Sequence, residues 1–158
     1  MTDTTKPLDR MRATIGVKRG PSAWRTVTQE DIDTFAKVSG DNNWIHVDVE
    51  RCRRESPFGA PIAHGNLTLS IIDGLVFPLE VISEEDVEVG LNMGWNRVRM
   101  PAPVLVDSRV RVIAEYVSAE DKGNGWWEFV DRYTVEIEGT EKPACVAENV
   151  TRLQFKEE

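Results

Sequence analysis

An acid and an imidazole stand five positions apart in the segment SGDNNWIHVD. Asp41 and His46 could hold one water molecule between them, with one group taking a proton while the other gives one. They can meet only in a turn or an irregular loop. An offset of five residues turns side chains apart on a helix and puts them on opposite faces of a strand. Gly40 and the two asparagines that follow Asp41 favour such a loop.

A structural interpretation of the same segment is also open. Asp41 would cap a turn, and His46 would pack on a short strand, IHVDV. An acid and a histidine in one loop are a weak signal of catalysis, so spacing alone favours this structural interpretation.

The second histidine of the chain, His64, is followed directly by Gly65, at the expected start of an apolar helix. A backbone N–H group at a helix start lies at the positive end of the dipole and can bind an anion or an oxyanion. Alternatively, Gly65 only lets the loop pass close to a sheet, and His64 caps the helix or packs. A glycine at a helix start is by itself unspecific.

Hydrophobic periodicity predicts the helices that must position these groups. A first helix follows Thr28 and ends at Gly40, because Thr28 can cap it, acids occupy its first turn and its apolar residues recur with a period of 3.6. A second helix runs from about Gly65 to Phe77 and ends at Pro78. Its apolar residues cover most of its circumference, which is typical of a buried helix.

The second half of the chain alternates apolar and polar residues, as antiparallel strands with one solvent-facing side do. We expect strands over 87–100, 108–118, 126–139 and 145–155. The side chains expected on the apolar faces of the two middle strands are Val110, Val112, Ala114 and Tyr116, and Trp127, Phe129, Tyr133, Val135 and Ile137. These patterns predict an α+β fold in which a long antiparallel β-sheet wraps around a central buried α-helix.

Composition is that of an ordinary globular protein, and we expect a single domain over residues 1–158. A net charge of −8 without a basic stripe argues against nucleic-acid binding. The longest apolar run is broken at Asp73, Gly74 and Pro78, so we expect no membrane span. The polar N-terminus predicts no signal peptide, a cytoplasmic protein and a loose arm over residues 1–15.

The two cysteines predict neither a metal site nor a disulfide. Cys52 and Cys145 have no CxxC spacing and no nearby histidine ligands, which argues against zinc. In a reducing cytosol we expect both to be free, buried thiols.

The two motif halves together resemble the MaoC-like family of hot-dog-fold hydratases, which includes the (R)-specific enoyl-CoA hydratases. The family pattern is a small residue, Gly-Asp-x-Asn-Pro-aliphatic-His, followed by Pro-Ile-x-His-Gly, and this chain has SGDNNWIH and then PIAHG. The likeness extends from about Trp24 to Phe155. It is closest to the nodulation-protein-N-like branch, through WIHVD, IAHGNLTLS, NRVRMPAPV and KPACVAE. The main departure is Trp44, where proline is usual.

The resemblance implies reversible hydration of trans-2-enoyl-CoA to (R)-3-hydroxyacyl-CoA, without a metal or an organic cofactor. Asp41 and His46 would activate the water, in roles that the sequence does not assign. The N–H of Gly65 would bind the thioester oxygen as enolate charge develops. The substrate would be a thioester of CoA or of acyl-carrier protein. Hot-dog domains typically pair, so a homodimer is expected.

Four further residues are candidates for substrate binding: Asn43, Trp44, His64 and Arg54. Trp44 could shape the mouth of the acyl pocket. Arg54 belongs to the basic segment ERCRRE, which could meet the phosphates of CoA or could be a solvated helical turn.

Two alternatives to a hydratase are open. An acyl-CoA thioesterase of the same fold would need an acid or base along the central helix, and Asp73 is the residue to watch. A non-catalytic acyl-binding or assembly protein would have no need of Asp41, His46 and Gly65 together, and their presence favours the hydratase.

Overall fold

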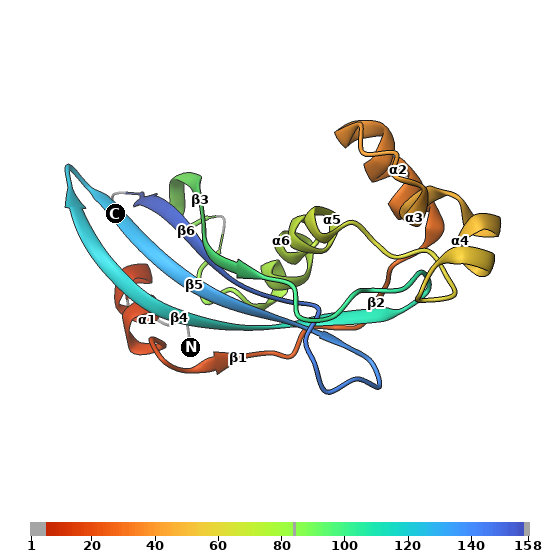
Figure 1. Cartoon of the computed structure of the whole chain (residues 1–158). Helices are drawn as coiled ribbons and strands as arrows, with labels where there is room; N and C mark the ends of the chain where they lie inside the picture. The colour runs from red at the N-terminus through yellow and green to blue at the C-terminus, as the bar shows by residue number, and fades with distance from the viewer. Residues whose placement is uncertain (1–5, 84, 157–158) are drawn as a thin grey trace.

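A computed structural model describes residues 6–83 and 85–156 of the chain. Its framework is one antiparallel sheet in the order β1-β4-β5-β6-β3, with β2 paired to β4. The strands are β1 (Lys18–Arg19), β2 (Arg25–Thr26), β3 (Val87–Arg99), β4 (Arg109–Gly123), β5 (Trp126–Ile137) and β6 (Cys145–Phe155). The long strands curve around a central helical segment (Figure 1). The predicted hot-dog arrangement of sheet and helix is confirmed.

The central helical segment consists of α5 (Gly65–Ser70), α6 (Ile72–Val76) and the short 3-10 helix η1 (Phe77–Leu79). Ile72 and Leu75 face the sheet and are buried. Asp73 and Gly74 lie on an exposed side, so the prediction of a helix apolar nearly all round is wrong on that side. The segment therefore covers the inner face of the sheet on one side and is exposed to solvent on the other.

The core lies between this segment and the inner face of the sheet. Val110, Val112, Ala114 and Val135 are fully buried, as their alternation predicts, and Ile137 is nearly so. Trp127 is only partly buried and packs at the far end of the sheet. Both cysteines are free and buried, as expected, and burial raises the pKa of the Cys145 thiol to about 11.

Three helices form a lobe at one end of the sheet: α2 (Gln29–Ser39), α3 (Trp44–Val47) and α4 (Val49–Glu55) (Figure 1). Thr28 caps α2 through a reciprocal pair of bonds with Asp31, and Gly40 ends it with a left-handed φ of 78°. Both ends of α2 thus lie where the sequence predicts them.

The expectation of a loose N-terminal arm is wrong for the part of that arm which the structure describes. Residues Pro7–Ala13 form α1, which packs at the opposite end of the sheet from α2. Met11 is 2% exposed, and Arg10 forms an ion pair with Asp86 at 2.7 Å. These contacts hold a helix too short to be stable alone. Residues 1–5 lie outside the described residues.

Strand β3 lies at one edge of the sheet and is paired only with β6 among the described strands. Val89, Leu91 and Met93 alternate along it and are 38%, 46% and 48% exposed. None of the helices in the described ranges is long and apolar enough to cross a membrane.

Candidate active site

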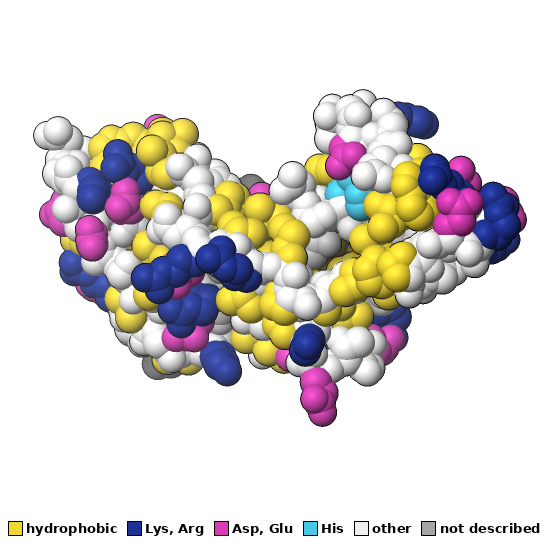
Figure 2. All heavy atoms as spheres, viewed as in Figure 1, with side chains coloured by type: hydrophobic (Ala, Val, Ile, Leu, Met, Phe, Trp, Pro, Cys, Tyr) yellow, Lys and Arg dark blue, Asp and Glu magenta, His cyan; other side chains and the backbone are white. Residues whose placement is uncertain are grey.

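Asp41, His46 and His64 come together where the α2–α4 lobe meets the central helix. Each offers a nitrogen or oxygen ligand atom, and these atoms lie within 4.8 Å of one another. Asp41 follows α2, His46 lies on α3, and His64 directly precedes α5. Histidine surface is visible in the hollow beside α2 (Figure 2). Two motif halves that are separate in sequence therefore build one cluster.

The segment after α2 folds as a tight turn that begins at Gly40. The N–H of Asp41 donates to Ser39 Oγ at 3.2 Å, and Asp41 Oδ1 accepts from the N–H of Asn43 at 3.3 Å. Asn43 Oδ1 in turn accepts from the N–H of Ile45 and caps α3. The predicted loop is confirmed for Asp41. His46 lies on a helical turn, so the alternative strand IHVDV is wrong.

Main-chain contacts hold the two motif halves together. The N–H of Ile62 donates to the carbonyl of Ile45 at 3.1 Å. His46 Nδ1 donates to the carbonyl of Ile62 at 2.7 Å, and His64 Nε2 donates to the carbonyl of Asp41 at 2.9 Å. Gln29 also donates to the carbonyl of His46 at 2.9 Å. Each histidine is thus anchored by the motif half to which it does not belong.

These bonds set the tautomer of each imidazole, because a carbonyl oxygen only accepts. Neutral His46 then presents Nε2 as an acceptor, and neutral His64 presents Nδ1. His64 is 3% exposed, and its Nδ1 has no hydrogen-bond partner among the described residues. The two rings stack at 3.8 Å between centroids, and Phe35 covers His64 at 5.1 Å.

The cluster has the donor types of a metal site, but its geometry favours proton transfer. The imidazole planes are only 26° apart and their centroids are 3.8 Å apart. The lone pair of an imidazole nitrogen lies in the plane of its ring. Because the two rings are stacked, an ion in line with the lone pair of one histidine lies well out of the plane of the other ring. Tetrahedral zinc needs its ligand axes to converge. A water molecule that bonds to Asp41 and His46 has no such requirement.

Gly65 occupies the first position of α5, so the helix does not use its N–H group. The side chain of Met100 lies against it. A Cβ added at this position would be 2.1 Å from Met100 Sδ, well inside contact distance. A side chain here would require Met100 to move, so the contact is with a side chain and not with the sheet backbone that the alternative interpretation expected. The free N–H of Gly65 is compatible with binding an oxyanion.

The structure gives the four candidate substrate-binding residues different surroundings. His64 is buried and supports Asp41 and His46, and Asn43 is occupied as a cap. Trp44 is half-buried, with the guanidinium of Arg51 4.2 Å above its ring. Arg54 is exposed on the last turn of α4. Trp44 and Arg54 thus remain accessible to a substrate.

Sequence reasoning missed two residues that hold His46 in place. Ile62 acts through its carbonyl, which no side-chain pattern can reveal. Gln29, at the start of α2, bonds to the main chain of His46, and its identity alone gave no signal. These contacts depend on how the two motif halves pair in space.

Comparison with known proteins places the chain in a family. The model of the MaoC like domain matches residues 10–136. A relative from Mycobacterium tuberculosis named 3-hydroxyacyl-thioester dehydratase Z is 46% identical over 142 residues, which cover 90% of this chain and 92% of the relative. Nodulation protein N from Rhizobium leguminosarum is 44% identical over 144 residues, covering 89% and 87%. A solved structure titled monoamine oxidase regulatory protein, from Archaeoglobus, superposes with a TM-score of 0.75 at 30% identity, covering 91% and 92%.

Proposed function

The chain belongs to the MaoC-like dehydratase family and is a hydro-lyase, and we propose that it adds water reversibly to trans-2-enoyl-CoA to give (R)-3-hydroxyacyl-CoA. The observation that carries this proposal is the convergence of Asp41, His46 and His64 from two motif halves. The 3-hydroxyacyl-thioester dehydratase named among its relatives supports this reaction class.

In the proposed reaction, His46 is the general base. Its Nδ1–H is held by the Ile62 carbonyl, so Nε2 is free to take a proton from water while the hydroxide oxygen bonds to the β carbon. The imidazolium passes this proton to the neighbouring Asp41 carboxylate, which delivers it to the α carbon. Both groups thus end in the state in which they began.

Gly65 is proposed to stabilise the charge that this attack creates. As water adds to the β carbon, negative charge moves onto the thioester oxygen. A preorganised N–H donor at that oxygen is worth far more in a site from which water is excluded than in bulk water. The N–H of Gly65, unused by α5 and adjacent to His64, is the donor that we assign.

We place the carrier of the acyl group, CoA or acyl-carrier protein, near Trp44 and Arg54, which are both accessible. We also propose a homodimer formed through β3. An edge strand with exposed apolar side chains is a ready surface for pairing with a second copy. Leu91→Lys should convert the dimer to a monomer in light-scattering measurements, and an unchanged mass would exclude β3 as the interface.

Thioester hydrolysis is the second candidate, and Asp73 is the observation that favours it. It lies on the open flank of α6 and lines a surface cavity with Asn92 and Asn149. Although the side chain is exposed, the protein around it partly desolvates the carboxyl and raises its pKa above the usual value. An acid or base on the central helix is what a thioesterase of this fold would use.

One assay separates the two reactions. Crotonyl-CoA and a longer trans-2-enoyl-CoA are supplied, and both the absorbance of the conjugated thioester and the release of free CoA are followed. Hydration predicts a fall in absorbance without free CoA. Free CoA without prior loss of the conjugated double bond would overturn the hydratase proposal in favour of hydrolysis.

A further inference from the structure

His64 is a buried histidine whose side chain makes its polar contact through Nε2. It is 3% exposed, and the rings of Phe35 and His46 pack against it with centroids at 5.1 and 3.8 Å. Nδ1 has no hydrogen-bond partner among the described residues, and Nε2 donates to the main-chain carbonyl of Asp41 at 2.9 Å. Burying a polar group costs free energy unless it is hydrogen-bonded. The bond to Asp41 is therefore the contact that needs a histidine here rather than an apolar ring.

The carbonyl that accepts this bond belongs to an exposed turn. Residues 40–43 are all exposed. The N–H of Asp41 donates to Ser39 Oγ, and the other hydrogen bonds inside the turn also join close neighbours in the sequence. Over residues 6–83 and 85–156, His64 provides the one hydrogen bond that the turn receives from a distant segment. Because ordering an exposed turn costs conformational entropy, this bond is the contact that fixes it against the rest of the protein.

His46 has anchors of its own. Its Nδ1 is held by the carbonyl of Ile62 at 2.7 Å, and its carbonyl accepts from Gln29 at 2.9 Å. Loss of the donor at His64 would therefore release Asp41 while His46 keeps its orientation. Proton transfer needs the two groups within about 2.6–3.2 Å of each other or joined by one water. A small displacement of the turn is enough to separate them.

We propose that His64 is a positioning residue: its Nε2–H fixes the turn that carries the Asp41 carboxylate, and it neither binds the substrate nor exchanges protons with it. The proposal rests on the proposed function, in which Asp41 takes a proton from His46 and delivers it to the α carbon. It replaces the substrate contact that the sequence predicted for His64. The role needs a hydrogen-bond donor at the position of Nε2 and does not need a group that titrates.

Three substitutions of His64 separate a donor from a titrating group. His64→Gln places an N–H donor as many bonds from Cα as Nε2 is, and His64→Asn places one at the position of Nδ1. His64→Phe keeps an aromatic ring without a donor. With crotonyl-CoA, kcat should stay within about threefold in His64→Gln and fall about 10- to 100-fold in the other two, with KM little changed. Equal losses in His64→Gln and His64→Phe would overturn the proposal.

A double variant shows whether His64 acts through Asp41. In an Asp41→Asn background, His64→Phe should lower kcat by less than about twofold, because the group that His64 positions is already inactive. A loss as large as in the otherwise unaltered chain would mean that His64 acts on another group, and would contradict the proposal.

The order of the turn is measured separately from activity, by backbone nitrogen NMR relaxation of residues 40–43. Order parameters should be about 0.85 in the unaltered chain and in His64→Gln, and below about 0.6 in His64→Phe. Unchanged order in His64→Phe would overturn the proposal whether or not the chain hydrates enoyl-CoA. If the unaltered chain does not hydrate enoyl-CoA, the proposed function fails, and the order parameters still decide whether His64 fixes the turn.

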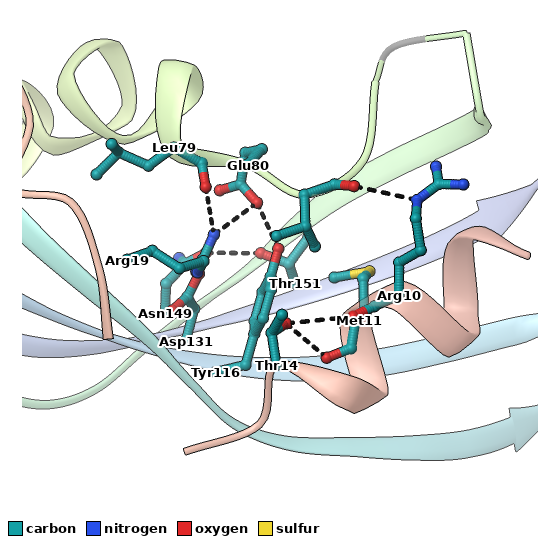
Figure 3. Close-up of polar contacts among 11 residues, drawn as sticks. Arg10, Met11, Thr14, Arg19, Leu79, Glu80, Tyr116, Asp131, Asn149 and Thr151 are labelled. Atoms are coloured by element: carbon teal, nitrogen blue, oxygen red, sulfur yellow. Dashed lines mark hydrogen bonds and ion pairs between the residues drawn. The ribbon is translucent and has the colours of Figure 1, made fainter. Parts of the chain in front are cut away.

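Tyr116→Phe is the matched control for the loss of a buried donor. Tyr116 is also 3% exposed, and its hydroxyl donates to Glu80 at the α1 end of the sheet (Figure 3). The substitution should lower the midpoint of urea unfolding, as His64→Phe does, and leave both kcat and the order of the Asp41 turn unchanged. A fall in kcat equal to that of His64→Phe would make a general loss of stability the cause, and the proposal would be wrong.

Discussion

The two ends of the sheet use acidic residues in opposite ways. At the α2–α4 lobe, Asp41 is exposed, and both imidazoles nearby are held by main-chain carbonyls. At the α1 end, Asp131 is buried and is held by the side chain of Arg19. Main-chain anchors fix the orientation of a histidine and leave its other nitrogen free for proton transfer. An ion pair instead occupies the groups that form it. The first arrangement suits chemistry, and the second suits stability.

The largest expected effect comes from breaking the first arrangement. His46→Ala and Asp41→Asn should each lower kcat for enoyl-CoA hydration by about 10²- to 10⁴-fold, because each removes a proton-transfer group. Circular dichroism should show an unchanged fold, since neither residue belongs to the core. Asn42→Ala, an exposed neighbour in the same turn, should retain most of the activity. Near-normal turnover in either of the first two variants would remove that residue from the mechanism.

The second arrangement should be visible in the pH dependence of stability. The pKa of Asp131 is about 6 in the folded chain, against 3.8 for an ordinary, solvated aspartate. The fold therefore binds this proton more tightly, and the free energy of unfolding should fall by about 2 kcal/mol as pH rises from 4 to 7. The charged and titratable groups around it are Arg19, Glu80, Tyr116 and Tyr133.

Urea denaturation across that pH range measures this contribution. In Asp131→Asn the corresponding fall should be absent, and Asp121→Asn should behave as the unaltered chain does. A variant at Asp131 with the same pH dependence as the unaltered chain would show that the two ends of the sheet do not differ in this way.

A smaller effect on activity is expected from a substitution that disturbs the close contact between Gly65 and Met100. Gly65→Ala places a Cβ against Met100 and should shift the N–H donor, lowering kcat/KM by about 10- to 100-fold. Met100→Ala alone should cost little, because Met100 is partly exposed and makes no polar contact in the proposed reaction. Combining the two should recover part of the loss. If the double variant is no better than Gly65→Ala, steric displacement by Met100 is not the cause.

Local patterns predicted much of the fold. The cap at Thr28, the glycine at position 40 and the alternation on β4 and β5 each depend on neighbouring residues and are confirmed. The same alternation puts Asp131 between Phe129 and Tyr133 on the buried face, a signal that was available from the sequence alone. A charged residue at an apolar position indicates a buried ion pair, here with Arg19.

Contacts between distant segments could not be predicted. Helix α1 exists because Met11 and Arg10 meet the far end of the sheet, and its own sequence is too short and polar to indicate it. The exposed flank of α6 depends on which elements cover the central helix. The proximity of Asp41, His46 and His64 could be inferred through a family resemblance. The tautomers of the histidines instead depend on the main-chain carbonyls of Ile62 and Asp41.

The most direct test is to follow the oxygen of the added water. The chain is incubated with crotonyl-CoA in water enriched in the heavy oxygen isotope, and the products are analysed by chiral chromatography and mass spectrometry. The account predicts (R)-3-hydroxybutyryl-CoA that carries the heavy isotope in its hydroxyl group, and none with His46→Ala. Labelled crotonate with free CoA, or labelled (S)-product, would contradict it.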